Sequence, residues 1–246
     1  MSMKLGKLAP KRHDKTLWLP KYLSAPLPVP PSKTYWEYKV KTWPMYLNDQ
    51  IGCCVFAAGG HMEQNWNAHS GISLTPTDQD VLAAYEAVGG YSPNDPSTDN
   101  GAAITDFLAY WQAAGFASRK ILGWAAIPLT YLAVRQAIYL FGSVDIGIQV
   151  PSSAMSQFSA GMPWDVVDPD GGVEGGHSIP VMGYGSEGMA CITWAKIQYM
   201  SNDFFTKYCD EAYAVITEDW FNQATQKTPG GFDLAALEAD LKAISA

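Results

Sequence analysis

The spacing of hydrophobic positions changes near the middle of the chain, from a helical period to an alternating one. In the first half, apolar residues recur three or four positions apart and a glycine follows each run, which predicts helices over 54–70, 78–88, 104–114 and 129–141. In the second half, β-rich segments separated by Gly and Asp predict strands over 143–150, 177–185, 189–200 and 211–218. Helices first and strands later favour an α+β fold with a helical lobe and a sheet lobe over alternating βαβ units.

The same pattern divides the chain. Residues 1–33 begin with a basic tract and then carry five prolines, so we expect an extended N-terminal arm packed along a surface, with the basic tract 3–15 in solvent. A main domain follows at 34–220, with a helical lobe at about 34–118 and a sheet lobe at about 119–220. A short helix capped by Ser201 is expected inside the sheet lobe, and 221–246 is expected to form a C-terminal amphipathic helix.

Two features inside the helical half are specific enough to test. Thr77 and Asp80 have the spacing of a capping box, which predicts where the second helix begins. Gly59 and Gly60 fall inside the first helix, where each costs about 1 kcal/mol relative to Ala. We therefore expect another stretch of backbone to approach the helix at these glycines.

Charge and composition exclude several classes of function. The net charge is -8 and the pI is about 4.9, which argues against a nucleic-acid surface. No apolar run is long enough to span a bilayer, so we expect no membrane partner. The N-terminal residues lack the apolar core of a secretory signal, so a cytoplasmic or virion-associated protein is expected. The four cysteines are too few and too unevenly spaced for a disulfide framework and are expected to be thiols.

Candidate chemistry begins at Cys54, the first residue of the first predicted helix. Unpaired backbone N–H groups and the positive end of the helix dipole favour a thiolate there. A thiolate nucleophile also needs a base and donors for an oxyanion. Of the four histidines, His177 is the best base, because it follows a glycine-rich turn and begins an apolar strand, whereas His61 and His69 are expected to be polar residues on a helix face.

The sequence gives only weak support for a metal site. His61 and His69 lie eight apart with no further ligand at a tight spacing, so zinc is disfavoured. Asp168, Asp170 and Glu174 resemble only the first half of a calcium loop. We interpret them as an acidic turn beside His177 whose carboxylates would favour basic substrates, and we expect no metal and no cofactor.

Together, NDQIGCCVFAA and GGHSIPVMGYG, with SLTPTDQDVLAAY and TDNGAAITDFLAYWQAAGF between them, resemble the papain-like cysteine peptidases, in particular a branch met in bacterial and bacteriophage genomes. The resemblance runs from about Trp36 to Thr217. It implies a two-lobed α+β fold in which a central helix of the helical lobe begins with the nucleophile and an antiparallel sheet lobe carries the base. On this resemblance Cys54 is the nucleophile, His177 the base and Asn48, six residues before Cys54, an oxyanion donor. Cys53 has no required role, because the residue six before it is Leu47.

The chain also departs from the family pattern. Asn48 stands where relatives have Gln, and Ile51 and Asp99 stand where secreted relatives have a disulfide, which fits a reducing compartment. Asn100 and Gly101 match the turn that contacts bound peptide. Thr193 stands where relatives place the Asn that orients the base, followed by Trp194 as an aromatic shield.

Two functions remain open from the sequence. One is a cysteine peptidase or amidase acting on a peptide or protein substrate, with Thr193 as a weaker orienter of His177. The other is a catalytically impaired or inactive papain-fold protein with a structural or binding role, for example assembled into a bacteriophage particle or engaged with a host. A vicinal disulfide between Cys53 and Cys54 would silence the site.

Overall fold

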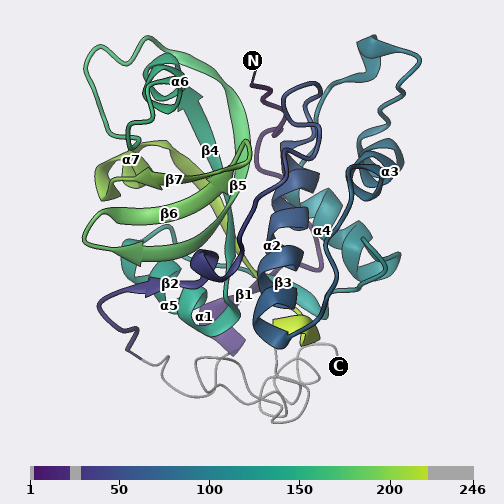
Figure 1. Ribbon diagram of the computed structural model, residues 1–246, viewed down its shortest axis with the longest axis horizontal. Helices are drawn as coiled ribbons and strands as arrows, with labels where there is room; N and C mark the ends of the chain where they lie inside the picture. Colours follow the sequence, from purple (N-terminus) through teal and green to yellow (C-terminus); the bar gives the residue numbers. More distant parts are fainter. Residues whose placement is uncertain (1–2, 23–28, 221–246) are drawn as a thin grey trace.

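The computed structural model describes residues 3–22 and 29–220. The helices are α1 (Leu19–Tyr22), α2 (Cys54–Ser70), α3 (Asp78–Gly89), α4 (Ile104–Ala113), α5 (Tyr131–Phe141), α6 (Ser152–Ser159) and α7 (Asn202–Tyr208). The strands are β1 (Leu17–Trp18), β2 (Thr34–Tyr35), β3 (Gly123–Ala126), β4 (Val144–Pro151), β5 (Val173–Gly185), β6 (Gly188–Thr193), β7 (Lys196–Met200) and β8 (Cys209–Ile216). The sheet, with α5, α6 and α7 against it, lies on one side of the molecule, and α2, α3 and α4 lie on the other (Figure 1).

A single sheet connects all the strands. Their order is β1-β3-β8-β4-β5-β6-β7, with β2 added beside β5, and every pairing except β1 with β3 is antiparallel. The long strand β5 lies between β4 and β6, so its residues are buried from His177 to Tyr184. The expected α+β architecture, with an antiparallel sheet, is therefore confirmed.

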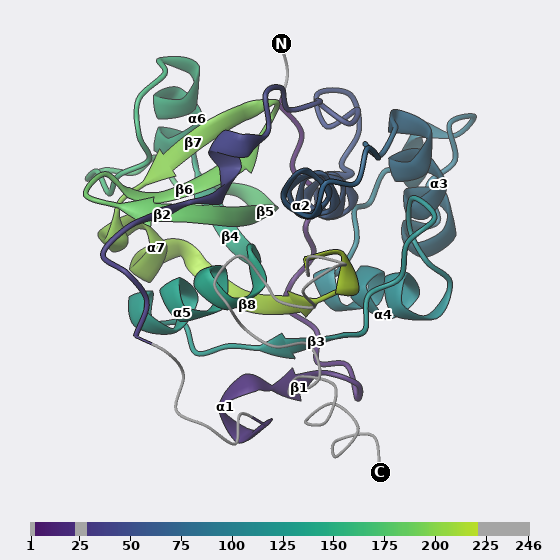
Figure 2. The ribbon, with the colours of Figure 1, turned by 60° about the horizontal axis from the view of Figure 1, so that its bottom comes forward.

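Helix α2 lies between the sheet and the other helices of its side, α3 and α4 (Figure 2). It begins at Cys54 and ends at Ser70, with Gly71 in the left-handed conformation as its C-cap, as the sequence pattern predicts. Its two internal glycines admit aromatic rings: a Cβ on Gly59 would lie 2.5 Å from the ring of Phe107, and one on Gly60 would lie 2.8 Å from the ring of Tyr46. The expectation that another stretch of backbone approaches α2 at these glycines was wrong, because aromatic rings pack against them instead.

Several other predicted elements are confirmed. The capping box of Thr77 and Asp80 is present at the start of α3, and Ser201 caps α7 through the Phe204 N–H. The predicted strand over 189–200 is in fact the hairpin of β6 and β7. Strand β3 and helix α6 were not predicted, and the C-terminal helix expected at 221–246 lies outside the described residues.

The N-terminal arm does not follow the expected course through solvent. Residues 3–8 run between the sheet side and α2, where the purple start of the chain is visible in Figure 2. Lys7 is only 5% exposed, although residues 8–12 are exposed as expected. Residues 3–6 are half-buried and Lys7 is buried, because backbone groups of Gly176 and Ala102 and the carboxylates of Asp210 and Glu211 surround this part of the basic tract. No helix in 3–22 or 29–220 is long and apolar enough to cross a membrane.

Candidate active site

Cys54 lies at the interface of the two lobes, at the first turn of α2. It is 1% exposed, and the backbone N–H groups of Ser178, Gly6 and Val55 lie close enough to its sulfur to favour a thiolate. These three groups come from the sheet lobe, the N-terminal arm and α2 itself. The sulfur is therefore placed where a helix start meets β5, as the sequence predicts.

His177 lies opposite, on β5, and is also 1% exposed. Its Nε2 lies 2.7 Å from Oγ1 of Thr193 on β6, while its Nδ1 is buried with no hydrogen-bond partner among the described residues. His177 and Thr193, the expected base and the hydroxyl expected to orient it, are thus brought together from the neighbouring strands β5 and β6. The strand begins four residues before His177, at Val173, because Gly175 and Gly176 pair with Val150 and Gln149 of β4 and do not form a turn.

Trp194 covers the imidazole of His177. The two rings are stacked with their centroids 4.4 Å apart and an interplanar angle of 17°. Trp194 and Ala195 form the two-residue turn between β6 and β7, and both have positive φ, 43° and 62°. Such turns favour Asn and Gly, so this Trp-Ala turn carries local strain, and it places the indole over His177.

Asn48 also reaches this site, but its amide is engaged by the arm. Its side-chain Nδ2 donates to the backbone oxygens of Lys4 and Ile51, at 3.3 Å each. The backbone oxygen of Asn48 accepts from Lys4 N–H at 3.0 Å. The indole N–H of Trp194 donates to the same Lys4 oxygen at 3.4 Å. A peptide carbonyl of the chain itself therefore lies against the expected oxyanion donor.

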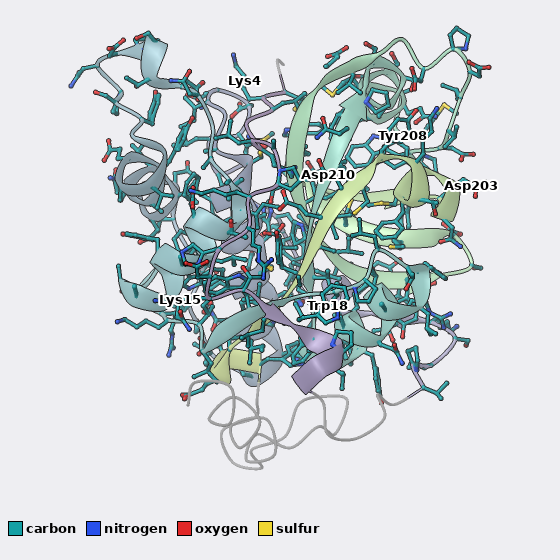
Figure 3. All side chains as sticks on the ribbon, turned by 180° about the vertical axis from the view of Figure 1, so that it is seen from behind. Lys4, Lys15, Trp18, Asp203, Tyr208 and Asp210 are labelled. Atoms are coloured by element: carbon teal, nitrogen blue, oxygen red, sulfur yellow. The ribbon has the colours of Figure 1, made fainter. Side chains whose placement is uncertain are left out.

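The arm continues through the site with its backbone paired to both lobes. On the sheet side, the N–H groups of Gly6 and Lys7 donate to Gly176 O at 3.2 and 3.0 Å. On the helix side, Ala102 N–H donates to Gly6 O and Leu8 N–H donates to Ala102 O, a parallel bridge. A Cβ on Gly6 would lie 1.9 Å from Gly52 O, so only glycine fits at this point. Figure 3 shows Lys4 and Asp210 near this boundary from behind.

The Asn100–Gly101 turn contacts the arm through only one of its two residues. Gly101 has φ of 75° and lies so close to Gly6 O that an added Cβ would be 1.9 Å away. The side chain of Asn100 is exposed and donates back to Ser97 O at 3.1 Å. The backbone hydrogen bonds to the arm come from the next residue, Ala102.

Asp99 occupies the place of the missing disulfide and connects the same two loops. Its Oδ1 accepts from Gly52 N–H at 2.9 Å and from the hydroxyl of Tyr85 at 2.6 Å. That hydroxyl in turn accepts from Gly101 N–H at 2.8 Å. The loop before α2 and the loop before α4 are thus held together by hydrogen bonds.

The other cysteines are thiols in the structure. All four are free, and Cys53 donates its S–H to Tyr46 O at 3.1 Å, so Cys53 and Cys54 are not joined. Cys53 is fully buried as the N-cap of α2. Its contact with Tyr46 gives it a structural place that the sequence does not reveal.

Burial keeps the two central groups neutral. Desolvation raises the pKa of the Cys54 thiol to about 11, although the surrounding N–H groups oppose that shift. Desolvation lowers the pKa of His177 to about 3, with a further contribution from nearby His61. With the arm in place, the site therefore holds a thiol and a neutral imidazole near pH 7. The space left between Asn48, Cys54, His177 and Thr193 is about 10 Å³, at the lower limit for one water molecule.

The histidines and acids weighed for metal binding have other partners. His61 and His69 each place Nε2 2.9 Å from a backbone oxygen, of Pro44 and Trp36 respectively. His61 is buried and lines the same small cavity as Cys54, so its expected place on a polar helix face was wrong. Asp170 accepts from the hydroxyl of Tyr208 at 2.7 Å. Within 3–22 and 29–220, no group of three His, Cys, Asp or Glu side chains could hold a metal ion.

Several residues at this site gave little signal in the sequence. The side chain of Ser178 donates to Oδ1 of Asp145, a fully buried carboxyl on β4 whose pKa burial raises well above its usual range. Lys7 lies in a tract that reads as an ordinary basic tail. Asp99 is the exception, since the sequence already shows it at a position where the resemblance implies a cysteine.

The backbone is similar to those of several cysteine proteases. Xylellain from Xylella fastidiosa superposes with a TM-score of 0.67 at 14% identity, covering 87% of this chain and 96% of that one. Procathepsin B from Trypanosoma congolense gives 0.57 at 13% identity, covering 87% and 86%. A Carica candamarcensis cysteine protease in complex with E-64 gives 0.55 at 14% identity, covering 76% and 99%.

No protein-family model matches the sequence, and no curated protein sequence matches it significantly. The structural likeness at these low identities establishes the fold. The chain has the papain-like fold, as the resemblance of its motifs implied.

Proposed function

We propose that this protein is a cysteine hydrolase that cleaves peptide or amide bonds, with Cys54 as nucleophile and His177 as general base. One observation carries the proposal: Cys54, His177, Asn48 and Thr193 line the same cavity between the lobes, with Nδ1 of His177 left without a partner. A thiol, a base, an amide donor and an orienting hydroxyl are the groups that acyl transfer requires.

The proposed reaction assigns one step to each group. With Nε2–H donating to Thr193 Oγ1, Nδ1 carries the lone pair and accepts the proton of Cys54. The sulfur attacks the substrate carbonyl carbon, and the oxyanion accepts hydrogen bonds from Asn48 Nδ2 and the Cys54 N–H. His177 then gives its proton to the leaving amine, leaving a thioester. Water, deprotonated by His177, attacks the thioester carbon, and the acid product and the free thiol result.

The arm must leave the cleft before this reaction can occur. While the arm is seated, Gly6 donates its N–H to Gly176 O and accepts from Ala102 N–H, so its backbone lies beside Cys54. Departure of the arm would also hydrate both groups, which removes the cause of the raised thiol pKa and the lowered imidazole pKa. The described closed form is therefore the resting form in this proposal.

The test is the reactivity of Cys54 in a full-length variant whose arm cannot fit. Gly6→Ala places a Cβ against Gly52 O, and Lys7→Glu, as a second variant, places a carboxylate beside Asp210 and Glu211. Either change should raise the rate of Cys54 alkylation by iodoacetamide at pH 7 at least tenfold, followed by peptide mass spectrometry. Leu8→Ala is the matched control, because Leu8 is exposed and its loss leaves the arm seated.

Catalysis is then tested in the same background. A peptide library should be hydrolysed by Gly6→Ala, and the added Cys54→Ala or His177→Ala change should abolish hydrolysis. Hydrolysis that survives Cys54→Ala would contradict the proposal.

The closed cleft also supports a second candidate, a non-catalytic papain-fold protein with a permanently seated arm. Alkylation that is unchanged by both arm variants and independent of His177 would favour it.

A further inference from the structure

Lys7 of the arm carries an ammonium group that is completely buried. Its side chain is 0% exposed, and Nζ lies 2.9 Å from Asp210 Oδ1 and 2.9 Å from Glu211 Oε1. It also donates to Leu8 O at 3.1 Å. A buried ammonium is costly unless opposite charges and hydrogen bonds surround it, as they do here.

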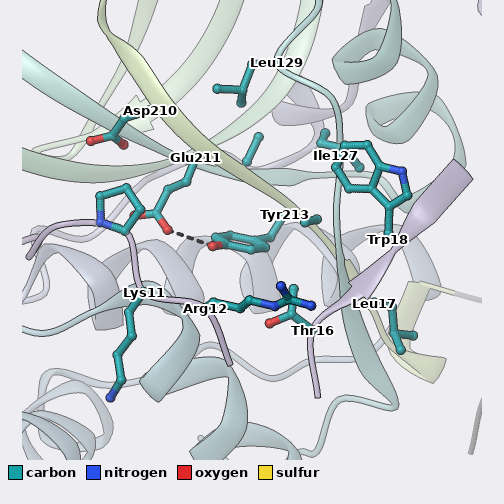
Figure 4. Close-up of a pocket in the computed structure, with 13 residues that line it drawn as sticks. Lys11, Arg12, Thr16, Leu17, Trp18, Ile127, Leu129, Asp210, Glu211 and Tyr213 are labelled. Atoms are coloured by element: carbon teal, nitrogen blue, oxygen red, sulfur yellow. Dashed lines mark hydrogen bonds between the residues drawn. The ribbon is translucent and has the colours of Figure 1, made fainter. Parts of the chain in front are cut away.

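The two carboxylates are held in place by neighbours other than the arm. Gln149 Nε2 donates to Asp210 Oδ2 at 2.6 Å, and the hydroxyl of Tyr213 donates to Glu211 Oε2 at 2.8 Å, the dashed contact in Figure 4. Asp210, Glu211 and Tyr213 lie on β8, and Gln149 lies on the adjacent strand β4. The carboxylate pocket, defined here as Asp210 and Glu211 with these supports, therefore belongs to the sheet lobe.

Space for the Lys7 side chain exists because a wall of this pocket is glycine. A Cβ on Gly147 of β4 would lie 2.0 Å from Lys7 Cε, too close for both to be present. Asp210 and Glu211 also line a separate cavity of about 620 Å³ between residues of the arm and of β8, together with Arg12 and Trp18 among others (Figure 4).

The pocket lies one residue away from the reacting sulfur. The N–H groups of Gly6 and of Lys7, the residue after it, both donate to Gly176 O, and Gly176 directly precedes His177. A peptide in the cleft would therefore place a side chain near the position that Lys7 now fills.

We propose that the carboxylate pocket of Asp210 and Glu211 selects a Lys or Arg side chain of the substrate, and that Lys7 fills this pocket while the arm lies in the cleft. The inference rests on the proposed hydrolase function. Two carboxylates face one ammonium in this pocket. A pocket that is empty, or that holds an apolar side chain, therefore leaves both carboxylates without a cation. Sites with buried unpaired polar groups reject a substrate that lacks the matching group.

The pocket itself is tested without catalysis. In full-length Lys7→Ala, n-propylammonium replaces the deleted atoms, so 100 mM should raise the midpoint of thermal unfolding by about 2–4 °C or more, whereas propan-1-ol should not. Adding Asp210→Asn and Glu211→Gln removes the charge, and adding Gly147→Ala removes the space. Either addition should abolish the shift. Equal shifts with the amine and the alcohol, or no shift with the amine, would overturn the carboxylate pocket.

Substrate selection is tested with thiol-directed peptidyl epoxides that carry Lys, Arg or norleucine at each position in turn. In Gly6→Ala and in Lys7→Ala, Lys or Arg at one position should accelerate labelling of Cys54 at least tenfold over norleucine. Asp210→Asn with Glu211→Gln should bring that ratio to about one and leave iodoacetamide labelling unchanged. Equal rates for Lys and norleucine, with fast iodoacetamide labelling, overturn the selection alone. No labelling by iodoacetamide overturns the hydrolase, and the amine experiment then still reports on the pocket.

Discussion

Thr193 makes the one hydrogen bond to the ring of His177 that the described residues contain. Its hydroxyl lies 2.7 Å from Nε2. In the proposed function, Thr193 would orient His177 with a shorter group than the Asn that the resemblance implies, and Trp194 is stacked on the same ring. The sequence shows that Thr stands at this position, but only the structure shows that its hydroxyl lies within hydrogen-bond distance of the imidazole.

At this scale we predict the effect of removing the hydroxyl. Thr193→Val keeps the shape of the side chain but leaves Nε2 unpaired, which costs about 1–3 kcal/mol for a buried group and so lowers kcat about 10- to 100-fold. Thr193→Ser, which keeps the hydroxyl, should stay within about threefold of the parent. Steady-state kinetics in the Gly6→Ala background measures both. Equal activity of the Val and Ser variants would show that Thr193 does not position His177.

At the scale of elements, the site depends on two loops that approach from different helices. The loop before α2 supplies Asn48 and Gly52, and the loop before α4 supplies Gly101 and Ala102. Asp99 joins them by accepting from Gly52 N–H and from Tyr85, whose ring also stacks on Tyr91 at 4.9 Å. Hydrogen bonds thus hold these two loops together at the place where the resemblance implies a disulfide.

This arrangement predicts a stability effect that is specific to the acceptor. Asp99→Ala leaves Gly52 N–H and the Tyr85 hydroxyl without their acceptor and should lower the free energy of unfolding by about 1–3 kcal/mol. Asp99→Asn keeps a carbonyl acceptor and should lose less. Urea unfolding monitored by tryptophan fluorescence gives the values. If Asp99→Ala in a Tyr85→Phe background costs as much as in the parent, the Asp99–Tyr85 hydrogen bond contributes nothing.

At the scale of the whole molecule, several acidic groups are enclosed when the lobes and the segment before α2 pack together. Glu37, in the 3-10 turn Trp36–Lys39, is 0% exposed, and neither of its oxygens has a hydrogen-bond partner in another described residue. Burial raises its pKa from the ordinary 4.5 to about 7, and its own backbone N–H opposes the shift. Folding therefore favours the protonated form of Glu37.

The sign of the pH dependence follows from this shift. The native state holds the proton more tightly than the unfolded state, so the contribution of Glu37 is fully present below pH 4.5 and is lost as the pH rises to about 7. Glu37→Gln should match the parent at pH 4 within about 0.5 kcal/mol and exceed it at pH 8 by about 1–3 kcal/mol. Urea unfolding of both proteins at the two pH values tests the difference. A gap that does not change with pH would contradict a buried, titrating Glu37.

Local chemistry decided most of what the sequence could predict by itself. The periodic apolar positions, the Thr77 capping box and the Gly71 stop place α2 and α3 nearly to the residue, because helix ends depend on neighbours within one turn. The motif resemblance pointed to Cys54 and His177, and the structure puts both on one cavity. The hairpin at Trp194 was missed, because its turn lacks the Asn or Gly that marks such a turn.

Only the tertiary structure shows what occupies the cleft. Lys7, Gly147 and Asp210 are far apart in the chain, and no local pattern relates the ammonium of Lys7 to a carboxylate about two hundred residues away or to the missing Cβ of Gly147. Burial of Cys54 and His177 likewise arises from long-range packing, in which α2 lies against β5 and Trp194 covers the imidazole, and it keeps both groups neutral near pH 7. The sequence determined which residues could do the chemistry. Long-range packing decided that, in this closed form, they are covered.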